Sequence, residues 1–147
     1  MADPTAQYFS QFFTSAFNKE IDIDSDTFAL MLLDDTYTPD LDTHRYKSDL
    51  AGEITATGYT AGGATVSPLT LSYNSGTKKL SFAGVNASWA EVTFDNVRYA
   101  ALVDITPGTD ATKPLVGLVD FKADQVRTAA PFGVTWNADG IGAVTVG

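Results

Sequence analysis

The first twenty residues carry aromatic side chains at the spacing of an α-helix. Phe9 and Phe13, and then Phe13 and Phe17, are four positions apart, which places them on one face of a helix with polar residues opposite. Asp3 or Thr5 can cap such a helix at its N-terminus. The aromatic stripe predicts burial against the protein's own sheet, with the surface of a partner as the alternative.

Residues 28–33 form an uninterrupted apolar run, which follows an alternating segment at 21–26. Apolar residues on both faces are typical of a central strand that is covered on both sides. Turn-forming residues at 34–43 then end the regular structure, and Pro39 restricts the residue before it. We expect a long loop there, followed by one helical turn within residues 44–50.

From Glu53 onward, short alternating segments are separated by glycine, asparagine and proline about every ten residues, which is typical of an all-β sandwich or barrel. The clearest unit is a hairpin, with strands at 69–73 and 78–82 joined by a turn at 74–77. Further strands are expected at 89–94, 97–105, 115–121, 132–136 and 141–146.

The pattern therefore predicts a mainly β protein, an antiparallel β-sandwich that is jelly-roll-like and has a short N-terminal helix. No internal repeat or low-complexity linker divides the chain, so residues 1–147 are expected to form a single domain, of which 1–20 is the helical N-terminal segment. The expected core residues are Phe28, Leu30, Leu32, Leu71, Leu80, Phe82, Phe94, Tyr99, Leu102, Leu115, Leu118, Phe121, Val134 and Trp136.

Composition excludes several functions. Nine basic residues against eighteen acidic ones leave a net charge of −9, which repels phosphate backbones and anionic lipid, so neither nucleic acid nor a membrane is an expected partner. The chain has no cysteine and a single histidine, His44, which excludes disulfides, thiolate metal sites and any site with two imidazoles. Residues 1–5 show no secretory signal, and synthesis in a cytoplasm is expected.

The acidic residues are concentrated at 20–42, where eight acids occur without a base. Asp22, Asp24 and Asp26 alternate as calcium ligands do, but the glycine and the terminal glutamate of an EF-hand loop are missing. The favoured interpretation is that these three side chains form the solvated face of an extended segment, and a calcium site is the alternative.

No catalytic motif is evident. A Ser-His-Asp triad would have to use His44, and the chain lacks a nucleophile elbow, so His44 is interpreted as a turn residue. The glycine-rich segment 58–63 is not followed by the lysine of a phosphate-binding loop, and tight turns explain it better. We therefore expect no enzyme activity, no cofactor and no metal.

Several segments together resemble small virion structural proteins of tailed bacteriophages. They are residues 28–33 followed by 37–44, 58–63 (Gly-Tyr-Thr-Ala-Gly-Gly), 85–89, 98–100, 114–121 and 136–141 (Trp-Asn-Ala-Asp-Gly-Ile). These are turn and strand residues, so the resemblance implies a β fold and a role in a particle without transferring an active site. Within virions, such small acidic proteins look like capsid decoration or cement proteins. The alternatives are a tail or fibre component and a receptor- or carbohydrate-binding β module.

The resemblance implies location in the virion and binding to the major capsid protein. A homo-oligomer is also expected, because the aromatic stripe exceeds what one sandwich covers and residues 37–50 are long enough to reach a neighbour. The resemblance implies a trimer in preference to a dimer, since decoration proteins often sit where three capsomers meet. The candidate interface residues are Tyr8, Phe9, Phe12, Phe13, Tyr37, His44, Arg45 and Tyr46.

Overall fold

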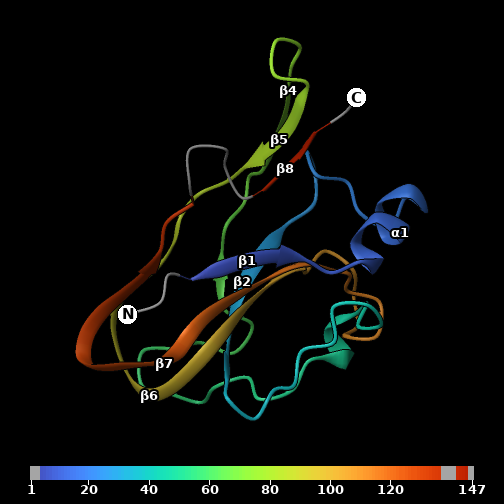
Figure 1. Ribbon diagram of the computed structural model, residues 1–147. Coiled ribbons are helices and arrows are strands. Elements are labelled where there is room, and N and C mark those ends of the chain that lie inside the picture. The colour runs from blue at the N-terminus through green and yellow to red at the C-terminus, as the bar shows by residue number, and fades with distance from the viewer. Residues whose placement is uncertain (1–3, 137–141, 146–147) are drawn as a thin grey trace.

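The computed structural model describes residues 4–136 and 142–145, and its larger sheet has five antiparallel strands (Figure 1). In spatial order they are β1 (Thr5–Tyr8), β7 (Leu115–Val134), β6 (Ala87–Asp104), β2 (Phe28–Asp34) and β3 (Ala64–Thr65). The smaller sheet contains β4 (Thr70–Asn74), β5 (Lys79–Ala83) and β8 (Gly142–Thr145) in that order. The predictions of a mainly β protein, of antiparallel sheets and of one short helix are confirmed.

Strand β2 is covered on both faces, as its continuous apolar sequence predicts. Phe28, Leu30 and Leu32 belong to the larger core, whereas Met31 and Leu33 on the opposite face belong to a second core with Phe9 and Tyr37. Alternate residues of a strand point to opposite sides of a sheet, so this one strand anchors both apolar layers.

Strands β6 and β7 form one long antiparallel hairpin rather than the four separate strands that the sequence predicted. The ladder shifts register at several points, and β7 contains two non-glycine residues with positive φ, Lys122 and Ala129. These irregularities let the hairpin bend, as bulges do, and the curved ribbon is visible at the lower edge of Figure 1. The turn-like residues between 94 and 97 and between 121 and 132 therefore lie in irregular parts of continuous strands, whereas those between 105 and 115 form the loop of the hairpin.

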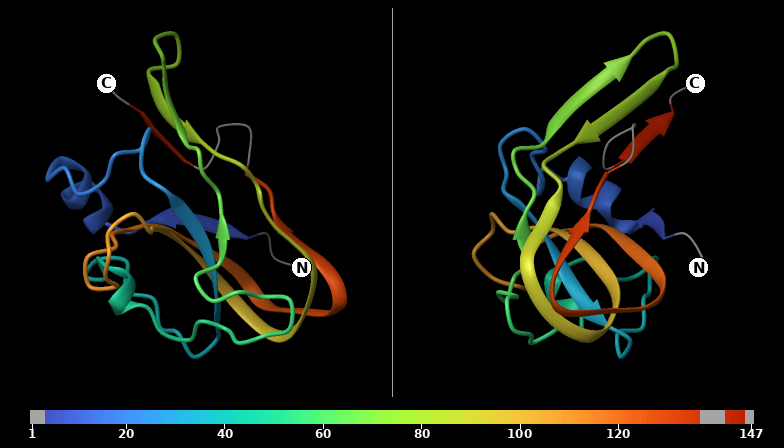
Figure 2. Two further views of the ribbon diagram at one scale, coloured as in Figure 1. Left: turned by 180° about the vertical axis from the view of Figure 1, so that it is seen from behind. Right: turned by 90° about the vertical axis from the view of Figure 1, so that its left-hand side faces the viewer.

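The predicted hairpin at 69–82 is confirmed as β4 and β5, with Leu71 opposite Phe82 and Tyr73 opposite Leu80. It extends away from the five-stranded sheet, and β8 pairs with β5 from Lys79 to Phe82 (Figures 1 and 2). We call residues 70–83 the arm.

The N-terminal segment differs from its prediction. Residues Thr5–Tyr8 pair with β7 as strand β1, and the helix α1 (Gln11–Phe17) begins only after them. The range 1–20 is thus not one helical segment, because the edge of β7 offers Thr5–Tyr8 a complete set of backbone partners. Thr5 lies inside β1, so it is not a helix cap, and Asp3 lies outside the described residues.

The expected core is largely confirmed, with one error. Leu71 is exposed because the arm leaves the body of the protein at that point, and Leu80, Tyr99, Val134 and Trp136 are only partly buried. The predicted helical turn at 44–50 corresponds to η1 (Lys47–Asp49), a short 3₁₀ helix. Among the described residues, no helix has the length and apolar character needed to span a membrane.

Candidate functional site

Exposed apolar side chains gather on the helix and the arm. Of the six large apolar residues that are exposed in the described part of the chain, two lie on α1 and two on β4. Phe17 is 86% exposed and Phe13 is 37% exposed, while Tyr73 and Leu71 are 53% and 44% exposed. We call these four residues the arm–helix surface.

The arm has one apolar and one polar face because of its register. Residues directly opposite each other on antiparallel strands point to the same side of the sheet. The pairs Leu71–Phe82 and Tyr73–Leu80 therefore share one face, and the intervening residues of both strands, mostly serine, threonine and asparagine, occupy the other. At the base of the arm Phe82 is buried, but toward the tip Tyr73 has no such cover.

An aromatic cluster fixes the base of the arm to the helix. Tyr8 of β1 stacks on Phe12 at 5.5 Å between ring centroids, and Phe82 of the arm lies 5.9 Å from Tyr8 and 6.1 Å from Phe12. Phe13 meets the edge of this cluster at 5.1 Å from Phe12. Such contacts hold ring orientations in addition to burying area, so α1 and the arm form one continuous surface.

An open hollow of about 440 Å³ lies where α1 meets the arm. Its walls come from the end of α1, from the segment that follows the helix, and from Leu71 of β4. Two acidic residues, Asp22 and Asp24, and one lysine, Lys19, lie at this hollow together with the apolar Ile21 and Ile23. The arm–helix surface is thus apolar at its centre and acidic along one side.

The arm itself has the opposite charge. Residues 66–90 contain two lysines, Lys78 and Lys79, and no acidic residue, in a chain whose net charge is −9. Lys78 is exposed at the turn between β4 and β5, where its φ is 58°. The tip of the arm is therefore basic, and its base lies beside the acidic hollow.

The structure separates the aromatic residues that the sequence grouped as a partner interface. Phe9, Phe12 and Tyr37 are buried by the chain's own residues. Their burial removes these three side chains as contacts for a partner in this conformation. Tyr8 is half-buried within the aromatic cluster, and Phe13 remains accessible.

The remaining predicted interface residues act as internal ties. Arg45 donates from Nη2 to Glu20 Oε1 at 2.7 Å and from Nε to Ser15 Oγ at 3.2 Å, and Tyr46 donates its hydroxyl to Glu20 Oε2 at 3.1 Å. Burial, together with the hydrogen bond to Glu20, raises the pKa of Tyr46. These contacts attach the 40–50 loop to α1 and its C-terminal continuation, so the loop is not free to reach a neighbour at Arg45 and Tyr46.

His44 has a structural partner. Its Nδ1 lies 2.8 Å from the hydroxyl of the buried Tyr37, and the two rings are 5.6 Å apart. The contact places the imidazole beside the second core, and it matches the interpretation of His44 as a residue of the loop.

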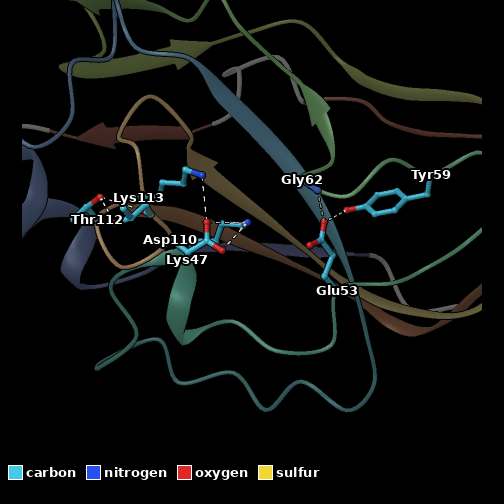
Figure 3. Close-up of polar contacts among 8 residues, drawn as sticks. Lys47, Glu53, Tyr59, Gly62, Asp110, Thr112 and Lys113 are labelled. Atoms are coloured by element: carbon cyan, nitrogen blue, oxygen red, sulfur yellow. Dashed lines mark hydrogen bonds and ion pairs between the residues drawn. The ribbon is translucent and has the colours of Figure 1, made fainter.

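The carboxylate of Glu53 lies in a second hollow, of about 370 Å³, beside β2 (Figure 3). It accepts hydrogen bonds from the Tyr59 hydroxyl at 2.8 Å and from the backbone N–H of Gly62. Burial raises the pKa of Tyr59. Both donors come from the glycine-rich segment 58–63, so Glu53 closes that loop.

The lysines of the same hollow are also paired. Lys47 and Lys113 donate to Asp110 at 3.1 and 3.2 Å, as the dashed lines in Figure 3 show. These two hydrogen bonds, from Lys47 first and then Lys113, lower the pKa of Asp110. The charged groups drawn in Figure 3 therefore tie loops together, and none of them is left to receive a ligand.

The acidic residues Asp22, Asp24 and Asp26 lie in a turn, so the prediction of an extended segment is wrong. Asp26 accepts from the backbone N–H of Asp22 at 2.7 Å, and Asp22 accepts from that of Asp24 at 3.1 Å. Within residues 4–136 and 142–145, no group of three or more acidic or histidine side chains is arranged to hold a metal ion.

The residues that the sequence missed are Phe17, Leu71 and Tyr73 as accessible groups. The sequence placed Phe17 in the helix stripe, Leu71 in the core and Tyr73 in the hairpin strand, and it did not predict their exposure. Comparison of this chain with protein-family models, with curated proteins and with solved structures found no match. The function must therefore be inferred from the surface itself and from the resemblance carried by the sequence segments.

Proposed function

We propose that this protein is a structural component of a tailed-bacteriophage virion, a capsid decoration or cement protein that binds the assembled head and stabilises it. The observation that supports this proposal is the arm–helix surface, where Phe13, Phe17, Leu71 and Tyr73 are each exposed on two elements that the aromatic cluster joins. Contiguous exposed apolar residues mark interaction sites in proteins that otherwise bury such groups.

The partners in this proposal are the major capsid protein and further copies of the chain. A protein that acts by covering area needs accessible apolar anchors and a stable fold, and it needs no titratable pair. The net charge of −9 disfavours nucleic acid and anionic membranes as partners. We therefore propose a non-enzymatic role within the particle.

The carbohydrate-binding alternative requires an accessible aromatic floor, for which Trp89 and Trp136 are the sequence candidates. Trp89 is buried between Tyr59 and Phe132, at 6.0 Å from each ring. Trp136 is half-buried and donates its indole N–H to the carbonyl of Val85 at 2.9 Å. Both indoles are thus engaged internally, which disfavours a sugar-binding platform.

The proposal is tested by co-sedimentation with phage heads that lack this protein, using the wild type and the double variant Phe17→Ser/Tyr73→Ser. We expect the wild type to pellet with heads in large copy number and the double variant to bind at least tenfold more weakly. Val126→Ser is the matched control, because Val126 is an exposed apolar residue of β7 outside the arm–helix surface.

Binding of the double variant at wild-type strength would show that another surface is used. Absence of wild-type binding to heads at any salt concentration, together with binding to purified tails, would assign the protein to the tail instead. Absence of binding to both would reject the virion role.

A further inference from the structure

Strand β4 is an unprotected edge. In the described residues it pairs with β5 alone, and all five of its residues are exposed. Its sequence, Thr-Leu-Ser-Tyr-Asn, contains no charge and no proline, and its register with β5 is continuous. Edge strands normally avoid pairing with other chains through lysine, proline or a bulge, and β4 has none of these. Figure 2 shows this strand at the outer side of the projecting arm.

We propose that β4 pairs in antiparallel orientation with β4 of a second copy of this chain, across a two-fold axis perpendicular to the sheet. The inference deepens the self-association in the proposed function, and it does not depend on the virion. The smaller sheets of the two copies then join into one sheet through their arms. Main-chain hydrogen bonds along such an added strand supply the affinity.

Charge complementarity favours a second copy over other occupants. Antiparallel pairing brings the tip of one arm beside the base of the other, because the strands run in opposite directions. The tip carries Lys78, and the base lies at the hollow where Asp22 and Asp24 outnumber a single lysine, Lys19. Two copies of an acidic chain repel each other in most orientations, but here the basic tip of each meets the acidic segment of its partner.

The same axis also places the apolar groups together. Rotation about an axis perpendicular to the sheet keeps the apolar faces of both arms on one side. Leu71 and Tyr73 of one copy then lie next to Leu71 and Tyr73 of the other, and together they form one apolar strip. An interface that uses the same patch on both copies closes with two subunits, so the assembly unit is a dimer rather than the trimer expected from the sequence.

The test reverses the charge on each side of the proposed contact between the tip of one arm and the acidic segment of the other copy. Sedimentation equilibrium of the full chain in about 0.1 M salt measures the dimer dissociation constant for wild type, Lys78→Glu, Asp24→Lys and the double variant. We expect each single reversal to weaken the dimer about tenfold or more, and the double variant to recover most of the affinity, since the opposite charges face each other again. Higher salt reduces the difference between the variants.

A second pair of variants tests the strand edge. Tyr73→Lys places a charge on the apolar face and should abolish dimers, whereas Val126→Lys, on an exposed site outside the arm, should leave them unchanged. Circular dichroism checks that each variant is folded. A wild-type chain that stays monomeric, or a dimer or trimer that Lys78→Glu and Tyr73→Lys do not weaken, overturns the inference. Binding to heads is measured separately, so its failure does not affect this result.

Discussion

The carboxyl group of Asp104, at the end of β6, is fully buried and interacts electrostatically with the carboxyl group of Asp26, in the segment before β2. Asp104 Oδ1 accepts from the backbone N–H of Thr106 at 2.9 Å, whereas its Oδ2 has no donor among the described residues. Burial and a neighbouring negative charge both disfavour the ionised form of a carboxyl, so Asp104 favours its protonated form. Burial, with a further contribution from Asp26, raises the pKa of Asp104 to about 7.

This pair predicts a stability that falls as the pH rises. Between about pH 4 and pH 7 the unfolded chain releases the Asp104 proton while the folded protein keeps it, so the free energy of unfolding decreases across this window and levels off above it. The expected slope for the wild type is about 1 kcal/mol per pH unit. Asp104→Asn removes the titrating group and should abolish this decrease. Urea unfolding from pH 4 to pH 8.5 measures both proteins.

The comparison has a matched control in Asp35→Asn, which changes an exposed carboxyl in the loop after β2. Its free energy of unfolding should follow the wild type at every pH. If Asp104→Asn also runs parallel to the wild type across the whole range, the interpretation that Asp104 stays protonated in the folded protein is wrong.

The glycine-rich segment contains two neighbouring glycines with different surroundings. Both Gly62 and Gly63 have positive φ, but a Cβ at Gly63 would collide with the backbone carbonyl of Leu30 in β2, while a Cβ at Gly62 meets nothing nearby. Gly63→Ala should therefore cost about 2–4 kcal/mol and Gly62→Ala about 1 kcal/mol. Denaturant unfolding measures both, and Gly108→Ala, in open space without positive φ, should change little. Equal costs for Gly62 and Gly63 would contradict the close packing on β2.

The hydroxyl of Tyr8 is buried in the aromatic cluster without a partner among the described residues, and burial raises its pKa to about 12. Tyr8→Phe keeps the ring stacked on Phe12 and removes the unsatisfied group, so it should stabilise the protein by about 1 kcal/mol. Tyr59→Phe should instead destabilise the protein, because the Tyr59 hydroxyl donates to Glu53 and accepts from the N–H of Leu32. Thermal melting should move upward for Tyr8→Phe and downward for Tyr59→Phe, and a decrease for both would refute the prediction for Tyr8.

His44 should contribute to stability and not to function. His44→Ala leaves the buried Tyr37 hydroxyl without its partner at 2.8 Å and should cost about 1–2 kcal/mol. Tyr37→Phe should cost less, because the half-buried imidazole can hydrogen-bond to water. Unfolding curves give the two costs, and co-sedimentation with heads should be unchanged for His44→Ala. Loss of head binding by a folded His44→Ala protein would assign His44 to the interface instead.

Local pattern was sufficient for part of this structure. The uninterrupted apolar run at 28–33 predicted a central strand, and the alternation at 69–73 and 78–82 predicted the hairpin, because side-chain period and turn chemistry are properties of neighbouring residues. The same information indicated that the N-terminal aromatic residues needed a surface to cover. It also limited the chemistry of the chain through the absence of cysteine and the single histidine.

Contacts between distant residues decided the rest. Thr5 is extended because it pairs with Asp120, and Phe9 is buried while Phe17 is exposed because β1 and β7 fix the side from which α1 approaches the sheet. Leu71 and Leu30 are both leucines in strands, but only Leu30 has a second layer above it, and that depends on strand order, which no local pattern contains. The arm–helix surface and the interaction of Asp26 with Asp104 therefore exist only in the folded chain, because packing brings together groups that the sequence separates.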